Sequence, residues 1–361
     1  MVPFVPLQPG DRLMAIAPSG TLRETEAFHR SLDLWRAEGY GVDLAEGYDR
    51  RWGYLAGTDD QRGEQLLQAW QDPRYRGILA IRGGWGAARL LEACPWPPGG
   101  GSITGNISGN ISGTMPGAIP GNVSGNVSGN VSGAIPGNIS GNVSGSMPGS
   151  MPGAIPGTIP GEVSGVAAPK WLLGFSDVTA LLWSLYGAGG LGLHGPVLTT
   201  LAAEPDWSQR RLFGWLRGEP LEPLQGEGWG GGVATGALLP GNLTVATHLL
   251  GTRIQPDLRG VILAFEDVGE MPYRIDRLLT QWRMTGALHQ VAGVALGRFS
   301  QSEPSPGVPS FSVEEVLHDR LGDLGIPVVS GLPFGHDGPN ALLPVGVPVV
   351  LDGDRGVLAF G

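Results

Sequence analysis

The hydrophobic period changes half-way through residues 171–190, which read Trp171-Leu-Leu-Gly-Phe-Ser176-Asp-Val-Thr-Ala-Leu-Leu-Trp-Ser-Leu-Tyr-Gly-Ala-Gly-Gly190. The apolar run before Ser176 predicts a buried strand, and the spacing after Asp177 predicts a helix that the glycines end. Ser176 would then lie at a helix N-terminus, beside unpaired backbone N–H groups and the positive end of the helix dipole. A hydroxyl held there can attack a carbonyl. It can equally be a simple helix cap, and the match to Gly-x-Ser-x-Gly is partial because Val178 occupies the last position.

Strands and helices alternate in the residues that precede this stretch. We predict strands at 11–20, 40–44 and 77–81, and helices at 24–38, 59–71 and around 88–91. This alternation predicts an α/β fold with a doubly wound parallel sheet, whose sites lie beyond the carboxyl ends of its strands. Residues 82–86, Arg-Gly-Gly-Trp-Gly, follow the third strand and lack the phosphate-binding glycine patterns. Their glycines suit either a tight turn or backbone N–H donation to an oxyanion.

A four-residue repeat interrupts the pattern from Gly101 to Ser164. It contains sixteen units of the form Gly-x-(Ile/Val/Met)-(Ser/Thr/Pro), with Glu162 as its one charged residue and no aromatic residue. One apolar side chain in four offsets little of the entropy lost on ordering the chain. We interpret the repeat as a disordered or loosely extended insertion. The alternative is a small solenoid that stacks its Ile, Val and Met side chains.

Composition excludes several classes of function. A formal net charge of −10 over 361 residues disfavours nucleic acid as a partner, because phosphate-binding surfaces are basic. The single cysteine, Cys94, excludes an internal disulfide framework and a multi-cysteine metal site. No His-Glu-x-x-His or close His/Asp cluster suggests a metal centre. The absence of an apolar run of 18 residues and of a basic, apolar leader predicts a cytoplasmic protein without a membrane anchor.

The pattern of residues after 203 predicts further strands and helices, and several of these strands end in polar residues. Residues 204–232, rich in Pro, Glu and Gly, suit a connection between a domain at 1–203 and a domain at 233–361. Residues 239–243, Leu-Pro-Gly-Asn-Leu, predict a turn into a helix. Glu266 ends a predicted strand at 259–266, and His336 follows one at 326–330. A histidine there can take a proton from Ser176, and a carboxylate can fix its tautomer.

Other assignments of these polar residues stay open. Glu266 could instead pair with Arg274 or Arg277, and its neighbour Asp267 is an equally polar candidate. His336 could be a hydrogen-bonding residue of a loop. His194 is the strongest rival as the base because it follows Ser176 closely in the sequence.

Several motifs in order resemble the LD-carboxypeptidase family of serine peptidases, which includes the microcin C immunity peptidases. In the first half these are residues 82–86 with Arg89-Leu90-Leu91, Gly174-Phe-Ser-Asp177 with Thr179-Ala-Leu-Leu182, and His194-Gly-Pro196. In the second half they are Leu239-Pro-Gly-Asn-Leu243, Phe265-Glu-Asp-Val268 with Tyr273-Arg-Ile-Asp-Arg277, and Gly335-His336. The resemblance covers the chain outside the repeat, which is the departure from the family pattern and could alter access to the site or a dimer contact.

The resemblance implies an N-terminal α/β domain and a smaller C-terminal domain, with a catalytic triad divided between them. It implies Ser176 as nucleophile, His336 as base and Glu266 as its orienting acid, with an oxyanion hole from the N–H groups of Asp177 and Gly84. It implies no metal or cofactor, and commonly a homodimer. The implied substrate is a murein tetrapeptide with meso-diaminopimelate before a terminal D-Ala. A peptide–nucleotide conjugate is the alternative substrate, and a non-catalytic ligand-binding protein on the same fold is the alternative function.

Overall fold

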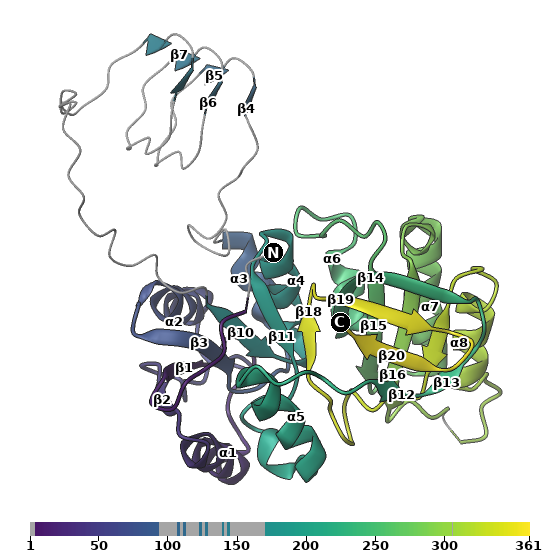
Figure 1. The fold of residues 1–361 in the computed structure, drawn as a ribbon, viewed down its shortest axis with the longest axis horizontal. Helices are drawn as coiled ribbons and strands as arrows, with labels where there is room; N and C mark the ends of the chain where they lie inside the picture. The colour runs from purple at the N-terminus through teal and green to yellow at the C-terminus, as the bar shows by residue number, and fades with distance from the viewer. Residues whose placement is uncertain are drawn as a thin grey trace. The chain divides into compact units, whose positions relative to one another are not determined.

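The computed structural model describes residues 4–93, 170–304 and 306–361, together with six two-residue strands between residues 107 and 144. The chain divides into two compact units, residues 1–98 with 168–361, and residues 99–167. The first unit contains two sheets, one built mainly from the purple to teal part of the chain in Figure 1 and the other mainly from the green to yellow part. Within the described residues, no helix is both long enough and apolar enough to cross a bilayer.

The first sheet has six strands in the order β18-β11-β10-β3-β1-β2. Five of them are parallel, and only β18 runs antiparallel to its neighbour β11. The strands are β1 (Arg12–Ile16), β2 (Gly41–Leu44), β3 (Tyr75–Ala80), β10 (Trp171–Gly174), β11 (Leu191–His194) and β18 (Leu343–Val345). The α/β class with a parallel first sheet, predicted from the alternation, is therefore confirmed.

Helices cover both faces of this sheet because its strands are apolar on both sides. In β3, Ile78 and Ala80 join one core cluster, whereas Leu79 and the following Ile81 join another. Helices α2 (Asp59–Gln71), α3 (Ala87–Ala93) and α4 (Thr179–Gly187) bury residues in the first cluster. Helices α1 (Thr25–Ala37) and α5 (Asp206–Leu216) bury residues in the second. The sheet is thus doubly wound.

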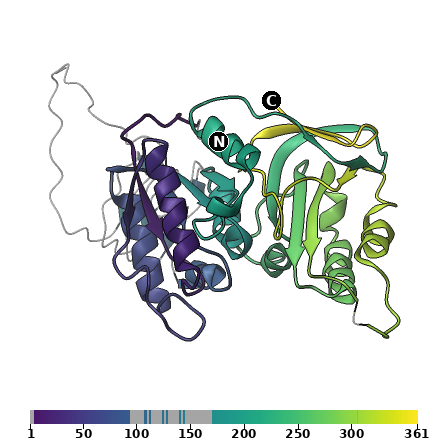
Figure 2. The same cartoon turned by 90° about the horizontal axis from the view of Figure 1, so that it is seen from below.

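The second sheet has eight strands in the order β12-β20-β19-β14-β15-β16-β17-β13. Its four middle strands, β14 to β17, are parallel, and the outer strands are antiparallel to their neighbours. The strands are β12 (Leu224–Gln225), β13 (Glu227–Gly228), β14 (Val233–Asn242), β15 (Ile262–Val268), β16 (Gly293–Ser300), β17 (Val328–Ser330), β19 (Pro348–Asp352) and β20 (Val357–Phe360). Its helices are α6 (Leu243–Leu249), α7 (Pro272–Met284) and α8 (Val313–Leu321), which Figure 2 shows against the green strands.

One hydrophobic core cluster joins the two sheets. It contains side chains of α4 on the first sheet together with side chains of β14, β15 and α7 on the second. Trp183 of α4 donates its indole N–H to the carbonyl of Pro240 at 2.9 Å and contacts Trp282 edge-on at 6.3 Å. Since both tryptophans are fully buried, this packing holds the Ser176 end of α4 against the carboxyl ends of β14 and β15.

Three local features differ from the sequence-based expectations. Residues 239–242 were expected to form a turn, but they are the last residues of β14 and pair with β15. The tract at 204–232 contains helix α5 and strands β12 and β13, so it is not a simple connection. The short strand β18 was not predicted, and Figure 1 shows it in yellow beside the teal β11. The domain boundaries at 203 and 233 stay a prediction.

The repeat unit forms two ladders of very short parallel strands. One ladder joins β4 (Ile107–Ser108), β6 (Val123–Ser124) and β8 (Ile139–Ser140). The other joins β5 (Ile111–Ser112), β7 (Val127–Ser128) and β9 (Val143–Ser144). Each partner follows the last by 16 residues, or four repeats, which is the pairing expected of a solenoid rather than of a wholly disordered insertion. The rest of the segment at 101–164 lies outside the described residues.

Candidate active site

Ser176 lies where β10 turns into the short helix η1 (Ser176–Val178), which leads into α4. Its backbone has φ 61°, a left-handed conformation that is uncommon for a residue other than glycine. Such strain persists only where the surrounding structure imposes it, and it marks functional turns. Two glycines make room for the turn. A Cβ on Gly174 would lie 2.2 Å from the Val178 side chain, and one on Gly83 would lie 2.8 Å from Cβ of Ser176.

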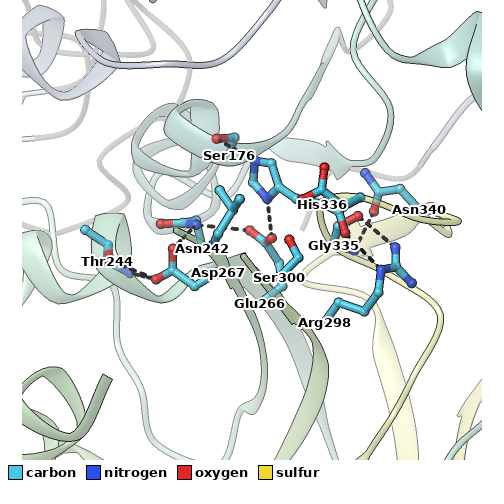
Figure 3. Close-up of polar contacts among 12 residues, drawn as sticks. Ser176, Asn242, Thr244, Glu266, Asp267, Arg298, Ser300, Gly335, His336 and Asn340 are labelled. Atoms are coloured by element: carbon cyan, nitrogen blue, oxygen red, sulfur yellow. Dashed lines mark hydrogen bonds and ion pairs between the residues drawn. The ribbon is translucent and has the colours of Figure 1, made fainter. Parts of the chain in front are cut away.

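His336 and Glu266 meet Ser176 at this point, although both belong to the second half of the chain (Figure 3). The Nε2 atom of His336 lies 3.2 Å from Oγ of Ser176. Its Nδ1 atom lies 2.6 Å from Oε2 of Glu266. A hydroxyl, an imidazole and a carboxylate thus form one continuous chain of hydrogen bonds, the arrangement of a serine nucleophile with its base and orienting acid.

Glu266 stands at the carboxyl end of β15, and its side chain is fully buried. The pairing of β15 with β16 shifts register between Phe265 and Asp267, so a bulge lies beside Glu266. The side-chain amide of Asn242 donates to Glu266 at 3.2 Å and to Asp267 at 2.8 Å. Burial, followed by the nearby charge of Glu266, raises the pKa of Asp267. Asp267 faces Thr244 and Asn242 rather than the imidazole, which leaves Glu266 as the partner of His336.

Arg298 of β16 holds the loop that carries His336. Its guanidinium donates to the carbonyl oxygens of His336 at 2.9 Å, of Gly335 at 2.8 Å and of Pro339. Burial lowers the pKa of Arg298, and the nearby carboxylates oppose that effect. The backbone N–H of Arg298 also donates to the carbonyl of Phe334 at 2.9 Å, which extends the pairing of β16 toward the loop. This role of Arg298 was not predicted from the sequence, because it depends on contacts with a loop nearly 40 residues further along the chain.

His194, the rival base, is not part of this hydrogen-bonded chain. It is fully buried at the end of β11, and neither ring nitrogen has a partner in another described residue. Phe175 meets the rings of both histidines, edge-on to His194 at 5.2 Å and tilted over His336 at 4.3 Å. Burial, helped by the nearby His336, lowers the pKa of His194 to about 3. The remaining histidines, His29, His248, His289 and His318, are exposed.

The two residues expected to form an oxyanion hole lie on either side of the Ser176 turn. Asp177 follows Ser176, and its buried carboxylate accepts the backbone N–H of Ala87 at 2.8 Å, which ties the turn to the start of α3. Gly84 has φ 110° and belongs to the glycine loop that lies against Ser176 through Gly83. The glycine-rich turn predicted at residues 82–86 therefore lies beside Ser176. The N–H roles of Asp177 and Gly84 stay a prediction.

A cavity of about 560 Å³ opens beside the imidazole. It is lined by Phe175, His336, Thr199, Thr200 and Glu204, together with residues 337–340. Two of the lining residues are bonded to each other, since the backbone N–H of Asn340 donates to the carboxylate of Glu204 at 2.8 Å. The cavity is large enough for a few residues of a peptide.

Residues 13–98 match the LD-carboxypeptidase N-terminal domain, and residues 235–351 match the LD-carboxypeptidase C-terminal domain. The chain belongs to the LD-carboxypeptidase family. The resemblance found in the sequence motifs is therefore confirmed, and membership of this peptidase family supports a hydrolase.

Relatives and solved structures extend over nearly the whole chain. A "Putative carboxypeptidase" of Synechocystis sp. is 50% identical over 99% of this LD-carboxypeptidase family member and 96% of its own length. The murein tetrapeptide carboxypeptidase of Pseudomonas aeruginosa is 27% identical over 96% of this chain and 95% of its own. The structure of a microcin C7 self-immunity protein superposes with a TM-score of 0.72 at 19% identity, covering 98% of this chain and 97% of that one. This last likeness concerns the fold.

Proposed function

We propose that this protein is a serine peptidase that hydrolyses the amide bond between an L-centre and a terminal D-amino acid. The observation that supports the proposal best is the hydrogen-bonded chain from Oγ of Ser176 through His336 to Glu266. Membership of the LD-carboxypeptidase family supports the class of bond. We also propose that the protein is a homodimer and that it is cytoplasmic. Gel filtration tests the first proposal and cell fractionation tests the second.

In the proposed mechanism, Oγ of Ser176 attacks the carbonyl carbon while its proton moves to Nε2 of His336. The Nδ1–H of His336 donates to Glu266, whose negative charge stabilises the imidazolium that forms. The N–H groups of Asp177 and Gly84 donate to the oxyanion of the tetrahedral intermediate. His336 then returns the proton to the leaving amine, and an acyl-enzyme on Ser176 remains. Water attacks this ester as its proton passes to Nε2 of His336. His336 then returns the proton to Oγ of Ser176 as the acyl product leaves, which restores the free enzyme.

The proposed substrate is a murein tetrapeptide, cleaved between its diaminopimelate and its terminal D-Ala. The relative from Pseudomonas aeruginosa, which is named for this activity and aligns over 96% of the chain, supports this choice. Cell-wall peptide recycling is the corresponding cellular role. A peptide–nucleotide conjugate would undergo the same chemistry at the same three residues, so the substrate has to be distinguished by experiment.

Incubation of the purified protein with murein tetrapeptide should yield the tripeptide and free D-Ala by mass spectrometry. Replacing Ser176 with Ala should lower kcat by a factor on the order of 10⁶, since a triad without its nucleophile retains little activity. The exposed Ser310 provides a matched control, because Ser310→Ala should keep wild-type turnover. Near-wild-type turnover of Ser176→Ala would refute the mechanism. Cleavage of an aminoacyl-nucleotide conjugate but not of the tetrapeptide would favour the other substrate.

A further inference from the structure

A fully buried arginine contacts the glycine loop at residues 82–86. The guanidinium of Arg62, on α2, donates to the carbonyl of Gly86 at 2.8 Å and to the carbonyl of Pro18, and its Nε donates to the carbonyl of Gly57 at 3.3 Å. A buried guanidinium is costly unless its N–H groups find partners, and these partners are backbone carbonyls of three separate segments. Arg62 therefore ties together three loops of the first sheet.

The peptide group between Gly86 and Ala87 is held at both ends. Its carbonyl accepts from Arg62 at 2.8 Å, and its N–H donates to the buried carboxylate of Asp177 at 2.8 Å. Gly86 has φ 126°, and a Cβ there would lie 2.9 Å from the guanidinium, so a glycine is needed for this approach. Since Asp177 directly follows Ser176, this peptide group fixes the glycine loop against the turn that carries the proposed nucleophile.

The other end of the glycine loop also depends on Arg62. The carbonyl of Gly83 accepts the N–H of Gly20 at 3.1 Å. Gly20 lies two residues after Pro18, whose carbonyl accepts from Arg62. One side chain thus supports both ends of the short segment that contains Gly84.

An acidic residue between two arginines fixes the direction of the Arg62 guanidinium. Asp59 accepts from Arg62, and it also accepts from Nε and a terminal nitrogen of Arg89 at 2.9 and 2.6 Å. The hydrogen bonds from Arg89 lower the pKa of Asp59, which favours its charged form. Burial raises the pKa of Asp177, and the hydrogen bonds to its carboxylate and the charge of Arg62 oppose this effect. The guanidinium therefore interacts with carboxylates on both α2 and the Ser176 turn.

We propose that Arg62 is a positioning residue of the oxyanion hole, which it shapes by holding the Gly86–Ala87 peptide group against Asp177. This inference rests on the proposed function, in which the N–H groups of Gly84 and Asp177 donate to the oxyanion. These two donors belong to different segments, so their spacing depends on how the glycine loop is fixed to the turn. Donors to an oxyanion act only within a narrow range of distance and angle, and small displacements therefore slow the reaction.

Comparing a peptide with its thioxo analogue tests the inference. The substrates are the murein tetrapeptide and the same peptide with sulfur in place of the oxygen of the scissile carbonyl, and release of D-Ala is measured for both. Sulfur is a weak acceptor, so the thioxo peptide gains less from an oxyanion hole. Arg62→Lys keeps the charge but loses the planar fork that reaches several carbonyls.

We expect Arg62→Lys to lower kcat about 100-fold for the oxo peptide and about tenfold for the thioxo peptide, with KM changed less than about twofold. The oxo-to-thioxo ratio of kcat then falls about tenfold. Arg210→Lys, an exposed arginine on α5, is the control and should leave the ratio unchanged. Asp59→Asn, at a partly exposed position, keeps an acceptor for the guanidinium but loses the charge, and it should lower the ratio about threefold. This second variant carries the test if Arg62→Lys does not fold.

An unchanged ratio in the folded variants would overturn the inference. Equal slowing of the two peptides would overturn it as well, because a displaced triad slows both alike. If wild-type protein cleaves neither peptide, the proposed function fails, and amide hydrogen exchange of residues 82–93 tests the support of the loop by itself. Faster exchange of this segment in Arg62→Lys, with β15 unchanged, would show that Arg62 holds the loop, and unchanged exchange would overturn that too.

Discussion

Replacing the buried His194 with Leu should make the protein less sensitive to acid. His194 is fully buried with a pKa of about 3, against 6.5 for an unperturbed histidine, so the folded protein binds fewer protons than the unfolded chain between these values. Stability is therefore lost as the pH falls from about 6.5 toward about 3. At pH 4.5 the solution is two units below the unfolded pKa, which at 1.36 kcal/mol per unit costs about 3 kcal/mol of the free energy of unfolding.

Urea unfolding at pH 7.5 and pH 4.5, followed by tryptophan fluorescence, gives this quantity for wild type and for His194→Leu. The loss of free energy of unfolding between the two pH values should be about 3 kcal/mol smaller in the variant, because every other titrating group is common to both proteins. Equal losses in the two proteins would refute the assignment of a neutral, buried His194. The variant should also keep wild-type turnover, and an inactive but folded His194→Leu protein would contradict the choice of His336 as base.

Two further substitutions test the geometry around Ser176 and His336. Gly83→Ala would bring a methyl group 2.8 Å from Cβ of Ser176 and should lower kcat about 100-fold by displacing the nucleophile. Gly63→Ala, where nothing lies within 4 Å, should leave kcat unchanged, and equal rates in both variants would argue against this packing. Arg298→Lys keeps the charge but loses the planar fork that donates to three carbonyls, so kcat should fall about tenfold with circular dichroism unchanged. Full activity would show that the loop holds His336 unaided.

The sequence was most informative where structure is decided locally. The change of period at Ser176 predicted the strand, the turn and the helix, because each depends on residues a few positions away. Glu266 and His336 were found because parallel strands place their carboxyl ends at one edge. The roles of Asn242 and Arg298 depend on register between strands, since Asn242 pairs with Glu266 across β14 and β15, and periodicity within one strand does not contain that information. Residues 239–242 were mistaken for a turn because Pro and Gly usually mark one. Their pairing with β15 also depends on register, which the pattern within one segment does not show.

Strand β18 has a consequence for how the protein can be divided. Residues 343–345 follow the loop that carries His336, yet they close the outer edge of the sheet that bears Ser176. The chain then returns to the other sheet through β19 and β20. A fragment that ends before residue 200 would therefore expose β11 as an unpaired edge, and the complementary fragment would carry an orphan strand. The C-terminal matched region thus supplies a strand to the sheet that begins in the N-terminal one. A chimaera that joins the two halves of different homologues should therefore fail to fold unless β18 and its partner β11 come from the same parent.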